Sequence, residues 1–322
     1  MPLRLLTYQD VKRLLTMADY IALQEQAFRL LAAGEFASMP NVRFSLSSPG
    51  SHFKLMAACR RRDGLATVKA IHRIAALSGR PVVAGAILLF DSHSNEVLAA
   101  MDAAHLTAQR TGAVAGLAAR YLARPGTEQV AILGAGAVAQ AAVEALALTL
   151  PDIRHARVYS RTTTGRERFA DSASAAVGWS VRPADDPEAA VRGAQIIVCA
   201  TTSPLPILKK HMLMSGACVL LIGSRSEVDP ECLAGMRLIV DSKDAVCEDA
   251  PVAALLREAS LEIASIHAEL ADVIAERIPG RISREETVLF ISSGLPVQDL
   301  VCAEFCYRRA IALGAGILVD FS

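Results

Sequence analysis

Two glycines, Gly134 and Gly136, stand where the chain passes from an apolar run at 130–133 into a helical pattern at 137–150. In this G-x-G-x-x-A spacing, Gly134 permits a tight turn and Gly136 lets a phosphate approach the backbone, while Ala139 keeps helix and strand close. The unpaired amide groups and the positive end of the helix dipole form an anion site. The pattern therefore predicts a bound dinucleotide rather than a glycine-rich turn in an ordinary α/β domain. Its expected contacts are Gly134, Ala135, Gly136, Ala137 and Val138.

The end of the next strand indicates which dinucleotide is bound. A domain that binds NAD usually places an acidic residue there, to hold the ribose 2′-hydroxyl. Here Ser160 takes that position without a charge, and Arg161 and Thr162 follow it. A guanidinium and hydroxyl groups suit a 2′-phosphate, although Arg161 could instead stack on the adenine. We therefore expect NADP(H) to be preferred, with NAD(H) as the alternative.

The elements that position these residues alternate between strand and helix after Pro125. Strand-like runs occupy 130–133, 156–160, 196–200, 218–222, 238–240 and 288–291, with helical patterns between most of them. That rhythm predicts an α/β fold with a Rossmann-type doubly wound parallel sheet.

The N-terminal part of the chain has a different pattern of expected helices and strands. A helix is expected over 8–33, with Thr7 as its N-cap and Gly34 as its stop. Residues 37–52 are expected to form loop or edge strand, and strands are expected at 53–58, 65–71, 82–90 and 96–101. A helix follows over 103–123, and a last helix over 296–312 is expected to fold back onto this α+β part.

Composition excludes several other classes of protein. Lys+Arg and Asp+Glu both number 33, so no global charge attracts nucleic acid or an anionic membrane. No apolar run is long enough to span a bilayer, and residues 1–10 lack the pattern of a signal peptide. The seven cysteines form no C-x-x-C pair and no metal-finger spacing. We therefore expect a reduced, cytoplasmic protein without a metal site.

Several ordered motifs resemble the ornithine cyclodeaminase/μ-crystallin family over nearly the whole length. They are LATVK at 65–69, LLFD at 88–91, LTAQRTG at 106–112, AARYLARP at 118–125, VCATTS at 198–203, and SGL at 293–295 followed by Asp299-Leu300. The resemblance implies a homodimer. It also implies a discontinuous substrate-binding and dimerisation domain, 1–118 plus 295–322, and a Rossmann domain, 119–294.

The resemblance also implies roles for individual residues. Arg110 matches the arginine that grips the substrate carboxylate, a task suited to its planar fork. Lys69 matches the active-site lysine, which could bind the carboxylate or donate a proton to the reacting nitrogen. Arg43 resembles an early arginine that faces the substrate. The alternatives are a surface salt bridge for Arg110 and a solvent-facing strand-edge position for Lys69. Further cofactor contacts are expected from Thr111, Thr201, Thr202, Gly223 and Ser293.

Two histidines, His72 and His105, match no catalytic position of the family, and we interpret both as structural.

One departure from the family bears on the reaction. Its cyclodeaminases carry an aspartate shortly after the strand that ends here at 221–223, where this chain has Ser224 and Arg225 in a shorter loop. Glu227 and Asp229 match a downstream E-x-D element that usually marks the next helix start. The loss disfavours cyclisation of ornithine and leaves hydride transfer intact.

The sequence therefore favours NAD(P)H-dependent reduction of a cyclic imino acid such as Δ1-pyrroline-2-carboxylate. The alternatives are an ornithine cyclodeaminase or amino-acid dehydrogenase of the same family, and a non-catalytic NADPH-binding protein like μ-crystallin. A sugar or hydroxy-acid dehydrogenase would have no reason to carry the motifs outside the Rossmann core. A non-catalytic chain would have lost Lys69 or Arg110, and this one keeps both.

Overall fold

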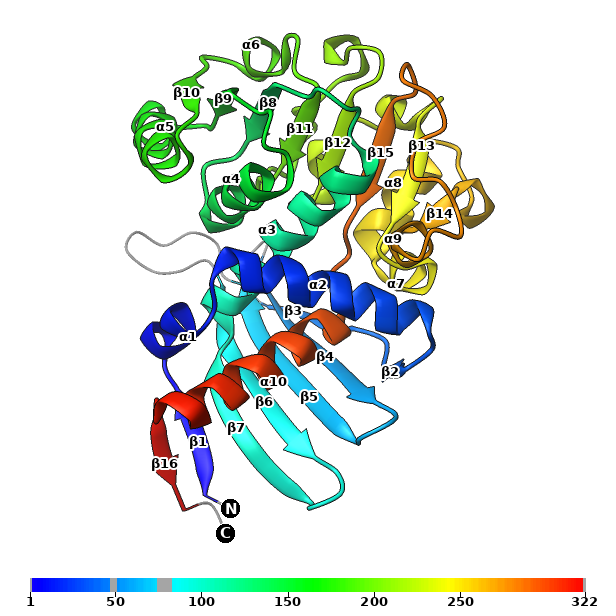
Figure 1. Ribbon diagram of the computed structural model, residues 1–322. Coiled ribbons are helices and arrows are strands. Elements are labelled where there is room, and N and C mark those ends of the chain that lie inside the picture. Colours follow the sequence, from blue (N-terminus) through cyan, green and yellow to red (C-terminus); the bar gives the residue numbers. More distant parts are fainter. Residues whose placement is uncertain (1, 47–50, 74–82, 321–322) are drawn as a thin grey trace. The chain divides into compact units, whose positions relative to one another are not determined.

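The computed structural model describes residues 2–46, 51–73 and 83–320, which form two compact units (Figure 1). Unit 1 comprises Met1–Arg110 and Leu295–Ser322, and unit 2 comprises Thr111–Gly294. The division falls inside helix α3, Ala103–Leu122. The boundary expected after residue 118 lies further along the same helix.

Unit 1 is built on one mixed sheet, with the strand order β16-β1-β7-β6-β5-β4-β2 and with β3 also paired to β4. Strands β4 to β7 form an antiparallel meander, and β1 runs parallel to β7. The strands are β1 (Leu3–Leu6), β2 (Phe36–Ser38), β3 (Val42–Ser45), β4 (His52–Arg60), β5 (Leu65–Arg73), β6 (Val83–Asp91), β7 (Glu96–Asp102) and β16 (Ile317–Val319).

The C-terminal helix α10, Pro296–Leu313, packs on strands β4 to β6, and α2, Met17–Ala32, packs on α10 (Figure 1). This arrangement confirms that the last helix folds back onto the N-terminal part of the chain. It brings residues from both ends of the sequence into one core.

The prediction of a single helix over 8–33 is wrong, because the chain forms α1, Tyr8–Leu14, and then a separate helix, α2. The side chain of Thr16 accepts a hydrogen bond from the Asp19 amide, and Asp19 accepts one from the Thr16 amide. This capping box starts a second helix. The helical spacing of apolar residues continues across the junction of α1 and α2, so the sequence pattern does not reveal the break.

The expectation of loop or edge strand over 37–52 is met by β2 and β3, except that residues 47–50 lie outside the described residues. The strand expected from residue 82 is β6, for which the described part starts at Val83. The short strands β1, β10, β14 and β16 were not expected.

Unit 2 confirms the doubly wound parallel sheet, with the strand order β10-β9-β8-β11-β12-β15-β13-β14. Every pair of neighbours in it runs parallel. The strands are β8 (Gln129–Leu133), β9 (His155–Tyr159), β10 (Ser180–Pro183), β11 (Ile196–Cys199), β12 (Cys218–Leu221), β13 (Arg237–Val240), β14 (Ala268–Glu269) and β15 (Val288–Ile291).

The α-helices between these strands are α4 (Ala137–Thr149), α5 (Thr163–Val177), α6 (Pro187–Val191), α7 (Lys243–Glu248), α8 (Ala250–Glu258) and α9 (Leu270–Ile274). The short 3-10 helices are η1 (Lys210–Met212), η2 (Arg225–Glu227), η3 (Pro230–Leu233) and η4 (Ile263–Ser265).

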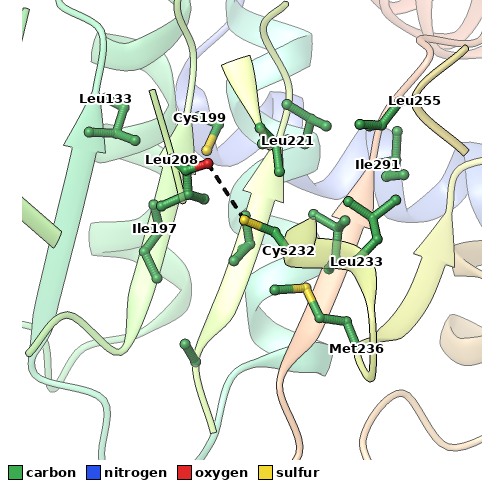
Figure 2. Packing of buried hydrophobic residues seen from close by; sticks show 14 of the residues in the cluster. Leu133, Ile197, Cys199, Leu208, Leu221, Cys232, Leu233, Met236, Leu255 and Ile291 are labelled. Carbon is green, nitrogen blue, oxygen red and sulfur yellow. Dashed lines mark hydrogen bonds between the residues drawn. The ribbon is translucent and has the colours of Figure 1, made fainter. Parts of the chain in front are cut away.

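A continuous apolar core holds the central strands of unit 2, whose residues are buried throughout (Figure 2). Cys199 and Cys232 lie in this core as free thiols, and the Cys232 thiol donates to the Leu208 carbonyl at 3.5 Å (Figure 2). A rigid sheet fixes the carboxyl ends of its strands, where ligands bind in open α/β sheets.

Helices α3 and α4 pack closely because α3 carries two glycines. A Cβ added at Gly112 would come within 2.4 Å of the Ala141 backbone, and one at Gly116 would come within 2.6 Å of the Ala145 side chain. This contact anchors α4, the helix that follows the glycine-rich turn.

No helix among the described residues has both the length and the hydropathy of a membrane-spanning segment.

Candidate functional site

The glycine-rich turn of unit 2 has the geometry that the sequence predicts. Gly134 has a φ of 116°, and a Cβ there would lie 2.5 Å from the Ala200 carbonyl oxygen. Only glycine adopts this conformation without strain. Gly134 therefore lets β8 turn tightly beside the end of β11.

Gly136 is the N-cap of α4 and has ordinary extended backbone, with φ −98° and ψ −178°. No described atom lies within 4 Å of a Cβ built on it. The packing of the protein therefore does not require glycine at this position. The space beside the helix N-terminus, where unpaired amides concentrate, fits the phosphates of a dinucleotide.

The end of β9 carries the residues that bear on cofactor choice. Ser160 donates to the Thr162 carbonyl at 3.2 Å, and Arg161 is exposed. Thr162 is the N-cap of α5. The position after β9 that carries an acid in NAD-binding domains is therefore a hydroxyl next to an exposed guanidinium.

A buried carboxyl group joins the ends of β11 and β12. Glu227 is fully buried, and its Oε2 accepts a hydrogen bond from the Thr201 amide at 2.9 Å. Its Oε1 would lie 2.4 Å from a Cβ on Gly223, and the Ser224 amide donates to the Thr201 carbonyl. The structure thus brings Thr201 and Gly223 together, with the exposed Thr202 next to them.

The helix-start interpretation of the E-x-D element is correct for Asp229, which caps η3 by accepting from the Glu231 amide. For Glu227 it is incomplete, because this side chain points inward and closes the loop after β12.

Burial raises the pKa of Glu227 to about 8, against the hydrogen bonds from Thr201 that lower it. The folded state therefore keeps a proton that the unfolded chain releases near pH 4.5, so this group's contribution to stability falls between about pH 4.5 and pH 8. For one proton the slope is about 1.4 kcal/mol per pH unit. We expect Glu227→Gln to remove this slope, measured as the free energy of unfolding of variant and wild type between pH 5 and 8.

Glu231→Gln, at an exposed position in η3, is the control and should parallel the wild type over this range. A Glu227→Gln curve that also parallels the wild type would contradict the prediction.

The loop after β15 is held by Asp241, at the end of β13. This fully buried carboxylate accepts from the Ser292 hydroxyl at 3.1 Å and the Gly294 amide at 2.7 Å. Between them, the hydroxyl of Ser293 is buried and has no partner among the described residues. An unsatisfied buried hydroxyl is costly, so Ser293 is well suited to bind a ligand.

Ser224 and Arg225 stand in the loop where the resemblance places an aspartate in cyclodeaminases of the family. Arg225 donates to the carbonyls of Gly223 and Ser292 and lies 3.7 Å from an Asp249 oxygen. This cation therefore links the ends of β12 and β15. Thr111, at the start of unit 2, is buried within α3.

Two of the three predicted substrate residues of unit 1, Lys69 and Arg110, meet in a buried ionic cluster. Lys69 Nζ in β5 lies 2.5 Å from Oδ2 of Asp299, and Arg110 Nε in α3 lies 3.2 Å from Oδ1. Lys69, Arg110 and Asp299 are 1%, 5% and 1% exposed. The alternatives of a solvent-facing lysine and a surface salt bridge are therefore wrong.

The first turn of α10 supplies two groups to this cluster. Besides Asp299, Gln298 accepts from Arg110 Nη1 at 2.8 Å and from the Leu295 amide at 3.1 Å. Asp299 belongs to a motif of the resemblance that indicates no role for it. The signal that could reveal it is a carboxylate in a first turn of the last helix that is otherwise uncharged.

Lys69 is suited to proton transfer near neutral pH. Burial lowers its pKa to about 7, with Asp299 opposing and Arg110 reinforcing the shift. A group that titrates near the working pH is an efficient general acid. The cluster thus combines a guanidinium that can bind a carboxylate with an ammonium that can release a proton.

Arg43 does not join this cluster. It lies exposed in β3, with Nη2 3.2 Å from Nδ1 of His52. The register β3–β4–β5 places it on the same face of the sheet as Lys69. His105 packs its ring edge-on against Tyr8, at 5.2 Å between centroids, as a structural histidine does.

Comparisons with known proteins agree with these features. The sequence profile of the ornithine cyclodeaminase/mu-crystallin family matches residues 3–313. A Δ1-pyrroline-2-carboxylate reductase of Bacillus cereus is 32% identical over 249 residues, or 76% of each chain.

Two solved structures are similar over the whole chain. The Δ1-pyrroline-2-carboxylate reductase of Thermococcus litoralis, in complex with NADH and L-proline, has a TM-score of 0.93 at 29% identity and covers 98% of this chain and 100% of that one. An archaeal alanine dehydrogenase dimer with bound NAD has a TM-score of 0.91 at 27% identity and covers 100% of both chains. Because the profile spans nearly the whole length, this chain belongs to the ornithine cyclodeaminase/mu-crystallin family.

Proposed function

We propose that this protein is an NAD(P)H-dependent reductase that converts a cyclic imino acid, such as Δ1-pyrroline-2-carboxylate, into the amino acid. The observation that carries the proposal is the buried cluster in which Lys69 and Arg110 share the carboxylate of Asp299. The relatives from Bacillus cereus and Thermococcus litoralis, both Δ1-pyrroline-2-carboxylate reductases, support it.

A nicotinamide dinucleotide would supply the hydride for the imine carbon. Most of the residues that would hold it lie at the carboxyl ends of strands in the sheet of unit 2 or just after them: Gly134, Ala135, Gly136, Ala137, Val138, Ser160, Arg161, Thr162, Thr201, Thr202, Gly223 and Ser293. Thr111, in α3, is the remaining expected contact. The open space at Gly136 and the unpartnered hydroxyl of Ser293 support this assignment.

The groups of unit 1 would bind and activate the substrate. Arg110 would pair with the carboxylate through charge-assisted hydrogen bonds and so fix the imine carbon in position. Lys69 would donate a proton to the imine nitrogen, which must be protonated for hydride attack. Arg43 would add a further cation on the same face of the sheet. Each of these roles suits a small substrate with one carboxylate and a basic nitrogen.

The loop after β12 favours imine reduction over ornithine cyclisation. It carries Ser224 and Arg225, a hydroxyl and a cation bonded to two carbonyls, where the resemblance places the cyclodeaminase aspartate. An amino-acid dehydrogenase is the second candidate, since the archaeal alanine dehydrogenase is similar over the whole chain.

A substrate comparison tests the proposal. Purified protein is given Δ1-pyrroline-2-carboxylate, pyruvate with ammonia, or L-ornithine, each with the matching nicotinamide cofactor. We expect the imine to be turned over with the highest kcat/KM. Proline and ammonia formed from ornithine without imine reduction would overturn the proposal, and so would cofactor binding without turnover of any substrate.

The preference for NADP(H) is also a proposal, because the two solved relatives hold NADH and NAD. We expect Arg161→Ala to lower kcat/KM with NADPH by about tenfold to hundredfold, the value of a charge-assisted hydrogen bond, and to leave NADH little affected. Arg157→Ala, whose guanidinium bonds the Arg192 carbonyl instead, is the control. Equal efficiency with both cofactors, unchanged in Arg161→Ala, would contradict the prediction.

We also propose a cytoplasmic homodimer. The cysteines are free thiols, which suits a reducing compartment. The side chains of unit 1 that alternate with Lys69 and point away from α10 are largely apolar, and they include Val68, Leu88 and Phe44, which is 54% exposed. A second copy would bury this face, and the similar archaeal alanine dehydrogenase is a dimer.

The dimer makes a testable prediction. Leu88→Asp places a carboxylate on this apolar face, and we expect the mass in solution, measured by sedimentation, to fall from dimer to monomer. Leu313→Asp, at an exposed position at the end of α10, should leave it unchanged. A monomeric wild type, or a Leu88→Asp protein that stays dimeric, would contradict the prediction.

A further inference from the structure

Asp299 is the residue of the ionic cluster for which the sequence suggested no role. Its two oxygens contact different cations, Oδ2 that of Lys69 and Oδ1 that of Arg110. We infer that Asp299 is a positioning residue, which holds the amine that donates the proton and the guanidinium that binds the carboxylate in a fixed relation. This inference rests on the proposed function.

The contacts show how this positioning would work. The guanidinium of Arg110 is held by two neighbours in the first turn of α10, through Nε by Asp299 and through Nη1 by Gln298. A guanidinium has five N–H donors, so these two bonds leave others for a ligand. Because β5, α3 and α10 each supply one charged group, the geometry depends on tertiary packing, and Asp299 is the group common to both contacts.

The charges of the cluster also point to an anionic ligand. When all three groups are ionised, two cations face one carboxylate, which leaves an excess positive charge in a buried place. Such a charge is costly unless it is paired, and a substrate carboxylate would pair it. Among the described residues, the cluster is also influenced by Lys54, from β4, which adds positive charge, and by the buried thiol of Cys302 on α10, while Arg43 lies exposed on the same face of the sheet. None of these groups supplies the missing negative charge, since burial raises the pKa of that thiol.

A second ion pair of α10 provides a matched comparison. Glu304 lies 2.6 Å from Arg60, which is 2% exposed and also bonds Asp63. The buried cation of this group contacts two carboxylates, so it carries no unpaired charge for a ligand, and the further partner of Glu304, Arg308, lies at the surface. Glu304 thus shares the helix and the kind of contact of Asp299, but has no role in the proposed chemistry.

The experiment compares Asp299→Asn with Glu304→Gln in the full-length protein. Asparagine keeps the shape and an oxygen for Arg110 but loses the charge that favours protonated Lys69. We expect kcat/KM for the imine to fall by about thirtyfold or more, as for other broken buried charge pairs. We also expect a change in the pH profile of kcat/KM. Its falling limb, which lies near pH 7 in the wild type, should move to lower pH by about one unit or more. Glu304→Gln should lower the melting temperature without moving the limb.

A measurement that needs no turnover separates this inference from the proposed function. In protein with 13C-labelled lysine side chains, the Lys69 signal, assigned with Lys69→Met, should titrate at lower pH in Asp299→Asn than in the wild type. If Lys69 titrates at lower pH in Asp299→Asn but the wild type does not reduce the imine, the proposed function is overturned. The Lys69–Asp299 pair then has no catalytic role. The inference is overturned if the wild type reduces the imine while Asp299→Asn keeps both the wild-type pH profile and the wild-type titration of Lys69. If Asp299→Asn does not fold, Asp299→Glu, which keeps the charge, should restore the wild-type limb, and a shifted limb there would also overturn it.

Discussion

Arg110→Ala is expected to lower kcat/KM for the imino acid by about thirtyfold to several-thousandfold. The change removes the guanidinium that would pair with the substrate carboxylate in a buried site, at a cost of roughly 2–5 kcal/mol in transition-state binding. Steady-state kinetics of the folded variant measure the loss, with Arg120→Ala, an exposed arginine of the same helix, as the control. A value close to that of the wild type would remove Arg110 from the proposed substrate site.

Gly136→Val is expected to weaken dinucleotide binding by at least about hundredfold, or ~2.7 kcal/mol, while the protein stays folded. The protein itself leaves space for a side chain at this position and the backbone is extended, so the loss would come from the bound phosphates. A titration followed by nicotinamide fluorescence measures binding, and thermal unfolding checks the fold.

Gly134 supplies the contrasting variant. Its φ of 116° and the 2.5 Å approach of a Cβ to the Ala200 carbonyl predict that Gly134→Val destabilises the fold itself. Undiminished dinucleotide binding in Gly136→Val would place the cofactor elsewhere.

The features predicted correctly from the sequence are those written in a local pattern. The strand, glycine turn and helix around Gly134 are contiguous, and the buried strands of unit 2 read as short apolar runs. Lys69 and Arg110 lie in motifs of the family, which mark them as candidate site residues, and their roles in the site stay a prediction.

The features that were missed depend on partners far apart in the chain. Asp299 lies 230 positions from Lys69, and Asp241 lies 53 positions from Gly294. No local periodicity reports such a pair, because burial of the carboxylates follows from tertiary packing alone. The strands β1 and β16 were missed for the same reason, since they pair opposite ends of the sequence.

Deuterium transfer tests the proposed reaction most directly. The protein is incubated with Δ1-pyrroline-2-carboxylate and either NADPH or NADH deuterated at nicotinamide C4, and proline is analysed by mass spectrometry and NMR. We expect one deuterium at Cα, and far slower labelling in Arg110→Ala at equal protein concentration. Cofactor that binds but transfers no deuterium to the imine carbon would contradict the proposed function.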